Sequence, residues 1–414
     1  MERNYRMTNQ VKTPKIQRLI PMPHLKPNMH WQDLFFHVLM FFHRPVAWSN
    51  RAIAAKLTFW ATLVYGLWLL AAPAWAAGVS IGLLVFTLLD WRLLIWLPQA
   101  NISFGPVNPQ LMFMLVPRLL VAIAAAAVAY FGGTAWGISM FFGLEALGTL
   151  AYWWGLGVEP QRLTTTELTV TSPHLPTTAK PIRLLHLSDF HVERITQREA
   201  HILAYIEAAQ PDVIVLTGDY LNASNRCDSE AIAQVRDLLG QLSASGGAYA
   251  VLGTPCVDLP YIAPLHFQEN HIHLLRRDMI EVDLGDERRL TLLGLDCTHD
   301  LDYDGHLFSN LADLTPANTP TVFLYHSPEL MPQVSQRNVD LYLCGHTHGG
   351  QLRVPGYGAL FTSSATGKRY EMGRYDENGT TLYVSRGIGL EGFSMPRLRL
   401  FCPPEITMIT IQGA

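Results

Sequence analysis

The order of apolar and polar residues divides this chain into two parts of different character. Apolar residues are almost continuous between residues 53 and 157, whereas the rest of the chain mixes apolar and polar residues as soluble domains do. The apolar part contains four runs, at residues 53–76, 78–98, 115–132 and 135–157. Each run is close to the ~20 residues that a membrane-spanning helix needs. Short links at Ala72-Pro73-Ala74 and Phe131-Gly132-Gly133 predict two helical hairpins.

These runs predict a four-helix transmembrane region at residues 53–157. The alternative is a buried helical bundle of a soluble protein, but too few polar residues would remain to form its solvated face. Charged residues inside the runs are few. Asp90 and Arg92 mark either a polar site within the membrane or the end of a span, from which Arg92 reaches the interface. Glu145 is the other acidic residue within a span.

Basic residues predict the orientation in the membrane. The segment at residues 1–52 is rich in lysine and arginine, and Arg92 and Arg118 flank the loop between the second and third runs, whereas the two hairpin tips carry neither residue type. Basic loops stay on the cytoplasmic side, and four spans return the chain to that side. We therefore expect a multi-pass inner-membrane protein with a cytoplasmic C-terminal domain. Residues 31–42 are too short to span, and either lie in the interface as an amphipathic helix or pack on the bundle.

The remaining sequence predicts a linker and one α/β domain. Residues 158–180 are polar, with room for one edge strand, and residues 181–414 form the domain. Helical patterns at residues 196–209 and 230–243 alternate with short apolar runs, which is typical of an α/β fold. The predicted strands are at residues 182–187, 213–216, 248–252, 290–295, 321–325, 341–343 and 381–385.

Overall composition argues against a nucleic-acid-binding protein and against a disulfide-stabilised one. A net charge of −4 gives no reason to expect a nucleic-acid partner. The five cysteines are scattered and contain no Cys-x-x-Cys pair. This argues against a disulfide framework and fits a reducing compartment.

Acidic and histidine residues follow four of the predicted strands. They are Asp189 and His191, then Asp219, then His326, and finally His346 and His348. Ligands of open α/β sheets bind beyond the carboxyl ends of the strands, so these side chains are expected to meet at one edge. Carboxylates and imidazoles together suit two divalent metal ions that hydrolyse a phosphoester.

These motifs resemble the calcineurin-like metallophosphoesterases over residues 181–413. The likeness is strongest to a membrane-anchored bacterial branch that includes enzymes similar to UDP-diacylglucosamine pyrophosphohydrolases, and the tail at residues 383–390 and 398–406 supports it. The resemblance implies two stacked mixed β-sheets flanked by helices. It also implies two divalent ions, Mn, Fe or Zn, and a metal-bound water as the nucleophile. By position, Asp189, His191 and His348 would hold the first metal, Asp219 would bridge, and His326 and His346 would hold the second.

One motif departs from the family pattern. The family has Gly-Asn-His after the third strand, where the asparagine ligates the second metal and the histidine contacts the phosphoryl or leaving group. Here Thr254 and Pro255 follow Gly253. Proline can neither donate a proton nor stabilise charge, so the sequence identifies no protein general acid. Thr254, Cys256 and Asp258 are possible substitute ligands.

The sequence therefore predicts a membrane-bound, binuclear metal-dependent phosphoesterase that acts on a phosphoester or pyrophosphate bond. The predicted membrane location suggests two partners for this protein. One is a phosphorylated small molecule or a lipid-linked substrate, and the other is the bilayer. The alternative, motivated by Thr254 and Pro255, is a catalytically impaired pseudoenzyme that binds a phosphorylated ligand as a sensor or scaffold. A third possibility, a transporter with a regulatory domain, would require more polar residues along the spans.

Overall fold

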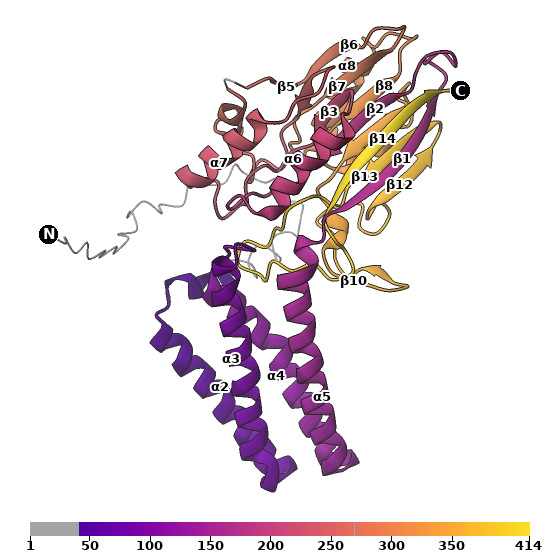
Figure 1. The fold of residues 1–414 in the computed structure, drawn as a ribbon. Coiled ribbons are helices and arrows are strands. Elements are labelled where there is room, and N and C mark those ends of the chain that lie inside the picture. The colour runs from indigo at the N-terminus through magenta and orange to yellow at the C-terminus, as the bar shows by residue number, and fades with distance from the viewer. Residues whose placement is uncertain (1–40, 269) are drawn as a thin grey trace, which may run out of the picture.

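The computed structural model describes residues 41–268 and 270–414, which form a helical bundle and an α/β domain placed end to end (Figure 1). Most of the predicted basic segment at residues 1–52 lies outside the described residues. So does the proposed interfacial helix at residues 31–42, apart from its last two residues.

The apolar runs form helices with short connections. They are α2 (Asn50–Ala71), α3 (Ala76–Gln99), α4 (Val107–Gly132) and α5 (Thr134–Trp153). The Ser49 hydroxyl caps α2 by accepting a hydrogen bond from the Ala52 amide. Gly133 connects α4 to α5 with a φ of 110°, a conformation that favours glycine. Both predicted hairpin links are present.

Three helices in the described part of the chain are long and apolar enough to cross a membrane. They are Asn50–Ala71, Pro73–Gln99 and Val107–Gly132. The fourth helix, α5, has 20 residues and packs against α4 and α3. The number of four spans stays a prediction.

The start of the third apolar run was predicted too late in the sequence. We expected Arg118 near a loop, but α4 begins at Val107 and Arg118 is buried within it. The first turn of α4 contains Asn108, Pro109 and Gln110, which interrupt the apolar pattern although proline is well tolerated there. Arg118 is therefore no guide to orientation.

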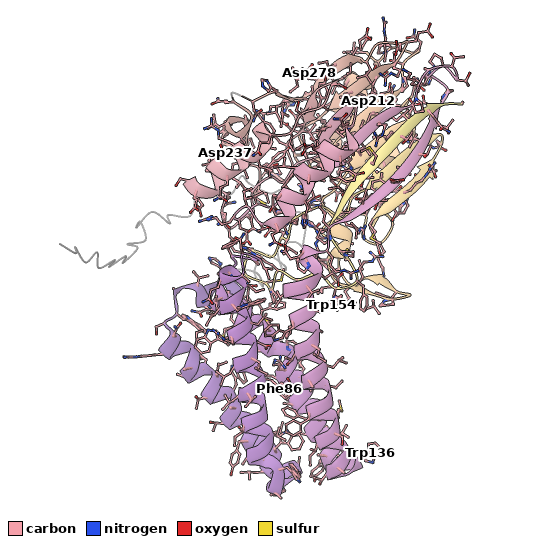
Figure 2. All side chains as sticks on the ribbon, in the orientation of Figure 1. Phe86, Trp136, Trp154, Asp212, Asp237 and Asp278 are labelled. Carbon is pink, nitrogen blue, oxygen red and sulfur yellow. The ribbon has the colours of Figure 1, made fainter. Side chains whose placement is uncertain are left out.

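The outward faces of the bundle are apolar rather than polar. Leu70, Leu120 and Leu150 are each more than half exposed, and aromatic residues cluster at the ends of the bundle. Trp136 lies at the tip far from the α/β domain, and Trp154 lies at the junction with it (Figure 2). Tryptophan at both ends of an apolar surface is typical of helices in a bilayer.

The α/β domain contains two mixed six-stranded sheets, as predicted. One sheet has the order β1 (Thr164–Ser172), β14 (Glu405–Gly413), β2 (Ile182–Leu187), β3 (Val213–Leu216), β4 (Ala248–Ala250) and β5 (Ile272–Leu274). The other has the order β12 (Gly373–Glu377), β13 (Thr380–Val384), β9 (Leu341–Cys344), β8 (Thr321–Leu324), β7 (Arg289–Gly294) and β6 (Asp278–Asp283). A small hairpin joins β10 (Arg353–Val354) to β11 (Gly358–Ala359).

The edge strand within the predicted linker is part of this domain. β1 pairs in parallel with β14 over its whole length. Residues 164–172 therefore belong to the first sheet, and the free connection to the bundle is shorter than residues 158–180.

Alternating side chains along the strands build separate layers of core. Leu184 and Val213 of the first sheet share an apolar cluster with Leu292 and Leu343 of the second sheet. On the other face of the first sheet, Leu185 and its neighbours pack on α6 (Gln197–Ala209) and α7 (Ser229–Gly240). The second sheet is covered by α8 (Leu301–Ala312) and α9 (Met331–Val334). This packing holds the strand ends of both sheets in fixed positions.

Candidate metal centre

The predicted residues follow the carboxyl ends of two pairs of parallel strands. Asp189 and His191 follow β2 and Asp219 follows β3, which is parallel to β2. His326 follows β8, and His346 and His348 follow β9, which is parallel to β8. The structure brings Asp189, His191 and His348 together as one group and Asp189, Asp219 and His326 as another, with ligand atoms within 4.8 Å of one another in each group.

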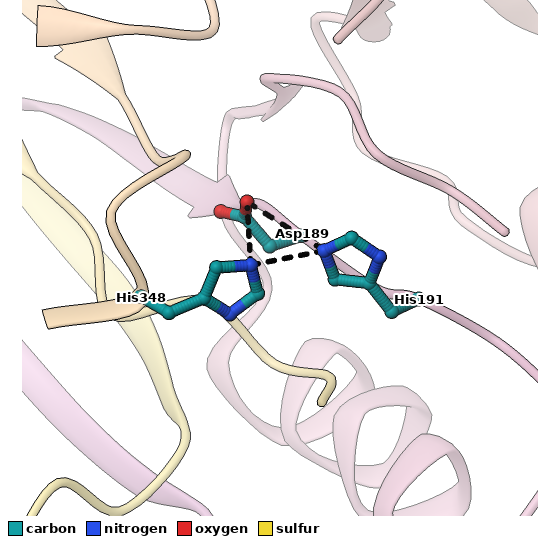
Figure 3. A group of neighbouring side chains, drawn as sticks. All are labelled: Asp189, His191 and His348. Atoms are coloured by element: carbon teal, nitrogen blue, oxygen red, sulfur yellow. Dashed lines mark hydrogen bonds and ion pairs between the residues drawn. The ribbon is translucent and has the colours of Figure 1, made fainter. Parts of the chain in front are cut away.

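The first group points three electron-pair donors at one another (Figure 3). The Nε2 atoms of His191 and His348 are 2.9 Å apart, and the Nε2 atom of His348 is 3.3 Å from Oδ1 of Asp189. Two ring nitrogens at this distance need either a proton or a metal cation between their lone pairs. The donor set of one carboxylate and two imidazoles fits such a cation.

Asp219 lies between the first group and His326. Its Oδ2 atom is 3.2 Å from Nε2 of His326 and 3.6 Å from Nε2 of His191. One carboxylate thus reaches imidazoles of both sheets, which is the position that a bridging ligand requires. The nearly complete burial of Asp219 makes its charge costly without cations nearby.

His346 lies beside these two groups without joining them. Its ring centroid is 5.1 Å from that of His326, and its Nδ1 atom is 3.4 Å from the hydroxyl of Thr254. Its amide donates to Oδ1 of Asp189 at 3.0 Å. The backbone of His346 therefore orients one candidate ligand while its ring faces the altered loop.

The backbone around the centre has a strained conformation. Left-handed φ values occur at Asp189 (51°), His191 (42°), Asp219 (58°), His346 (69°) and His348 (52°). A residue other than glycine costs about 1–3 kcal/mol in sparsely populated regions, and such residues cluster at functional sites. The strain turns each side chain sharply from its strand toward the shared edge.

Two glycines allow the backbone to approach the carboxylates. A Cβ atom on Gly345 would lie 1.9 Å from Oδ2 of Asp189, and a Cβ atom on Gly253 would lie 2.2 Å from Oδ1 of Asp219. Any side chain at either position would displace a candidate ligand.

A hydrogen bond at one outer ring nitrogen and an ion-pair contact at another orient two imidazoles. The Nδ1 atom of His326 lies 2.6 Å from the carbonyl of Thr217, and Nδ1 of His191 lies 3.1 Å from Oε2 of Glu391. When the imidazole is neutral, a proton on Nδ1 leaves the lone pair on Nε2 available to an ion. Glu391 could not be predicted, because a single glutamate in an irregular tail carries no local sequence signal.

Burial and mutual charge shift the pKa values of these groups. Burial lowers the pKa of His326, but the carboxylates of Asp219 and Asp189 outweigh it and raise the value to about 10. Burial lowers the pKa of His346 to about 3. Burial also raises the pKa of Asp189. The protein thus holds one imidazole as a cation against its carboxylates, where a divalent ion would compensate the same charges.

The altered loop contributes its backbone more than its side chains. The Thr254 amide donates to Oδ1 of Asp219 at 2.7 Å, and its hydroxyl is 3.4 Å from Oδ2. The Asp258 carboxylate accepts hydrogen bonds from the amides of Asp219 and Gly253 at 2.7 and 2.8 Å, so it supports the loop rather than facing the ligand groups. Burial raises the pKa of the Cys256 thiol to about 11, which disfavours a thiolate ligand.

Comparisons with known proteins agree with this geometry. The family model for calcineurin-like phosphoesterases matches residues 182–350. The chain is 29% identical over 298 residues to the uncharacterized metallophosphoesterase YkuE of Bacillus subtilis, covering 66% of this chain and 95% of that protein. It is 30% identical over 247 residues to the phosphodiesterase YaeI of Escherichia coli, covering 56% of this chain and 83% of that protein.

One relative, from cattle, is named as a transmembrane protein. The chain is 28% identical over 274 residues to the "transmembrane protein with metallophosphoesterase domain" of Bos taurus. The match covers 62% of this chain and 58% of that protein. Similarity to this family therefore extends to proteins described as membrane-bound.

Proposed function

This chain belongs to the calcineurin-like metallophosphoesterases, and from that premise we propose that it is a membrane-anchored hydrolase that uses two divalent metal ions to cleave a phosphoester or pyrophosphate bond. The convergence of carboxylate and imidazole donors from both sheets carries the proposal. Asp189, His191 and His348 would hold one ion, Asp219 would bridge, and His326 and His346 would hold the second.

The protein's own contribution is to position and shield these groups. When bound, two divalent ions lower the pKa of water and neutralise charge on a phosphoryl group. Glu391 and the Thr217 carbonyl orient the imidazoles, and the Thr254 amide holds the oxygen of Asp219 that would otherwise rotate. Such preorganised contacts reduce the reorganisation needed during reaction.

The connection between the two parts of the chain supports a substrate at the bilayer surface. The guanidinium of Arg399 lies 3.5 Å from Nδ1 of His348, and the Arg399 amide donates to the carbonyl of Gly155, just after α5, at 2.9 Å. The Cys402 amide donates to Glu159 at 2.5 Å, and the amide of Phe104 in the loop after α3 donates to Glu193 at 2.9 Å. The centre is thus linked to the end of the bundle that carries Trp154, so a lipid-linked phosphate is the substrate class we propose.

A cytoplasmic location follows from the basic residues. Arg44, Arg51, Lys56 and Arg92 lie toward the end of the bundle that meets the α/β domain, and the far tips carry no lysine or arginine. We propose an inner-membrane protein with its α/β domain in the cytoplasm. An active alkaline phosphatase fused to the C-terminus, together with a dark green fluorescent protein in the same position, would refute this orientation.

Activity is tested with the full chain in lipid nanodiscs supplied with Mn²⁺. We expect hydrolysis of p-nitrophenyl phosphate esters, loss of turnover in Asp219→Asn, and normal turnover in the control Glu281→Gln, which changes an exposed strand residue. Equal turnover in wild type and Asp219→Asn would reject the enzyme. Mn²⁺ and phosphate binding without turnover would favour the pseudoenzyme.

The substrate class is tested separately. A phosphorylated lipid incorporated in the nanodisc should be hydrolysed with a higher kcat/KM than a soluble ester with the same leaving group, because tethering raises local concentration. Equal kcat/KM values would exclude a lipid-linked substrate and leave the hydrolase assignment intact.

A further inference from the structure

The altered loop leaves one end of the metal centre without the imidazole that the family pattern places there. Pro255 has no side-chain donor, and Thr254 contributes its amide and a hydroxyl 3.4 Å from both Asp219 and His346. A phosphoryl group at this end would meet few hydrogen-bond donors from the loop.

We propose that His299 supplies the missing imidazole from a different strand and contacts the phosphoryl group of the substrate. This inference rests on the proposed function. His299 follows β7, which is parallel to β8, and β8 is parallel to β9. Three neighbouring strands therefore deliver His299, His326 and His346 to the same edge of one sheet.

The ring of His299 packs directly on a candidate ligand. Its centroid is 4.8 Å from that of His346. Among the other described histidines outside the candidate ligand set, none has a ring contact with a member of that set.

The backbone of His299 shares the strain of the candidate ligands. Its φ is 61°, between the values of 52° at His348 and 69° at His346. This left-handed conformation costs about 1–3 kcal/mol for such a residue and persists where the surrounding structure demands it. In this conformation the ring of His299 packs against that of His346.

Two neighbours orient the ring without closing it off. The Nδ1 atom lies 3.5 Å from Oε2 of Glu329, and Nε2 lies 3.6 Å from Sγ of Cys297. Glu329 is itself fixed, since its other oxygen accepts a hydrogen bond from the Ala365 amide at 2.6 Å. The contact with Glu329 is long for a hydrogen bond, so Nδ1 of His299 remains able to donate to an incoming oxygen.

Exposure and placement favour contact with substrate over metal ligation. The His299 side chain is 24% exposed, whereas that of His326 is fully buried. His299 is thus more accessible than His326, which suits contact with a phosphoryl oxygen.

The test measures binding of inorganic phosphate to the Mn²⁺-loaded full chain in nanodiscs by titration calorimetry. His299→Ala should weaken phosphate binding about tenfold to a hundredfold, which is the usual strength of a hydrogen bond to a charged group. The Mn²⁺ content by mass spectrometry should not change. His306→Ala, an exposed histidine on the adjacent α8, is the matched control and should bind phosphate normally.

A restoration variant keeps the test decisive if His299→Ala folds poorly. Adding Thr254→Asn and Pro255→His to His299→Ala rebuilds the family loop, and phosphate affinity should return. His299→Gln retains a donor and should show a smaller loss. Unchanged phosphate affinity in His299→Ala, or loss of Mn²⁺ from that variant, would overturn the proposal. Phosphate binding does not require turnover. The effect of His299→Ala on phosphate affinity can therefore be measured even if the protein hydrolyses no ester.

Discussion

Two buried clusters of charged side chains, one in the helical bundle and one in the α/β domain, differ in how their charges are balanced. In the bundle, Nε of Arg118 lies 2.6 Å from Asp90, and the same guanidinium also pairs with Glu145 and donates to Thr149 at 2.9 Å. In the α/β domain, Asp189 and Asp219 face imidazoles whose outer nitrogens are already oriented by other groups. One cluster carries its own cation, and the other is arranged to receive cations.

This difference separates a structural cluster from the candidate metal centre. A guanidinium with two carboxylates joins three helices and satisfies most of its hydrogen bonds inside the protein. The metal centre instead concentrates lone pairs and strained backbone at one sheet edge, an arrangement that functional sites tolerate. Variants that remove charge should therefore affect folding in the first cluster and ion binding in the second.

The largest expected effect comes from removing the cation of the bundle. Arg118→Met leaves Asp90 and Glu145 buried without a counter-charge, and breaking such a pair usually costs about 3–5 kcal/mol of unfolding free energy. Thermal unfolding in detergent should show the loss, while the Mn²⁺ content of the folded fraction stays normal. Arg92→Met, at an exposed position of α3, is the control. An unchanged unfolding temperature in Arg118→Met would remove the contrast between the clusters.

Removal of metal should destabilise the α/β domain through mass action. A cation that binds only the folded state, at a free concentration about 100 times its Kd, stabilises that state by about 2.7 kcal/mol. Differential scanning fluorimetry with Mn²⁺ and then with a chelator measures this shift. Asp219→Asn should show little response to either. A full response in Asp219→Asn would mean that the stabilising ion binds elsewhere.

A smaller effect is expected from the carboxylate that orients His191. Glu391→Gln keeps the size of the side chain but removes its charge, and outer contacts of this type change metal affinity by about tenfold to a hundredfold. This corresponds to about 1.4–2.7 kcal/mol. Competition with a fluorescent chelator measures Mn²⁺ affinity, with Glu281→Gln as the control on an exposed strand position. Equal affinity in Glu391→Gln and wild type would show that the contact of Glu391 with His191 is only structural.

The smallest effect concerns protons. Burial lowers the pKa of His326, but Asp219 and Asp189 raise it to about 10, so the metal-free site holds a proton there at neutral pH. The stability from this raised pKa is fully present below the unfolded value of about 6.5 and is lost as pH rises through about 10. Binding of Mn²⁺ at pH 7 should therefore release about one proton. Calorimetry in buffers of different ionisation enthalpy measures the number of protons released. If no proton is released, His326 is not protonated in the metal-free protein.

Prediction from the sequence succeeded where the determining forces are local. Short apolar runs identified β2, β3, β8 and β9. The polar residues after them include the five that the structure brings together in two groups. It was less accurate where a polar or proline residue interrupts the pattern, as at the start of α4. The two-residue strands β10 and β11 are too short to give a periodic signal.

The sequence by itself determined which segments are apolar enough for a membrane and which acidic and histidine residues follow strands, because both properties belong to short stretches of chain. Only the tertiary structure decided which charges meet. Asp90 and Arg118 are 28 residues apart, and the rotation of two helices pairs them. His299 reaches His346 because only β8 lies between β7 and β9 in the sheet. Glu391 reaches His191 from an irregular segment near the C-terminus. Such contacts depend on sheet order and packing between distant segments, which no local pattern encodes.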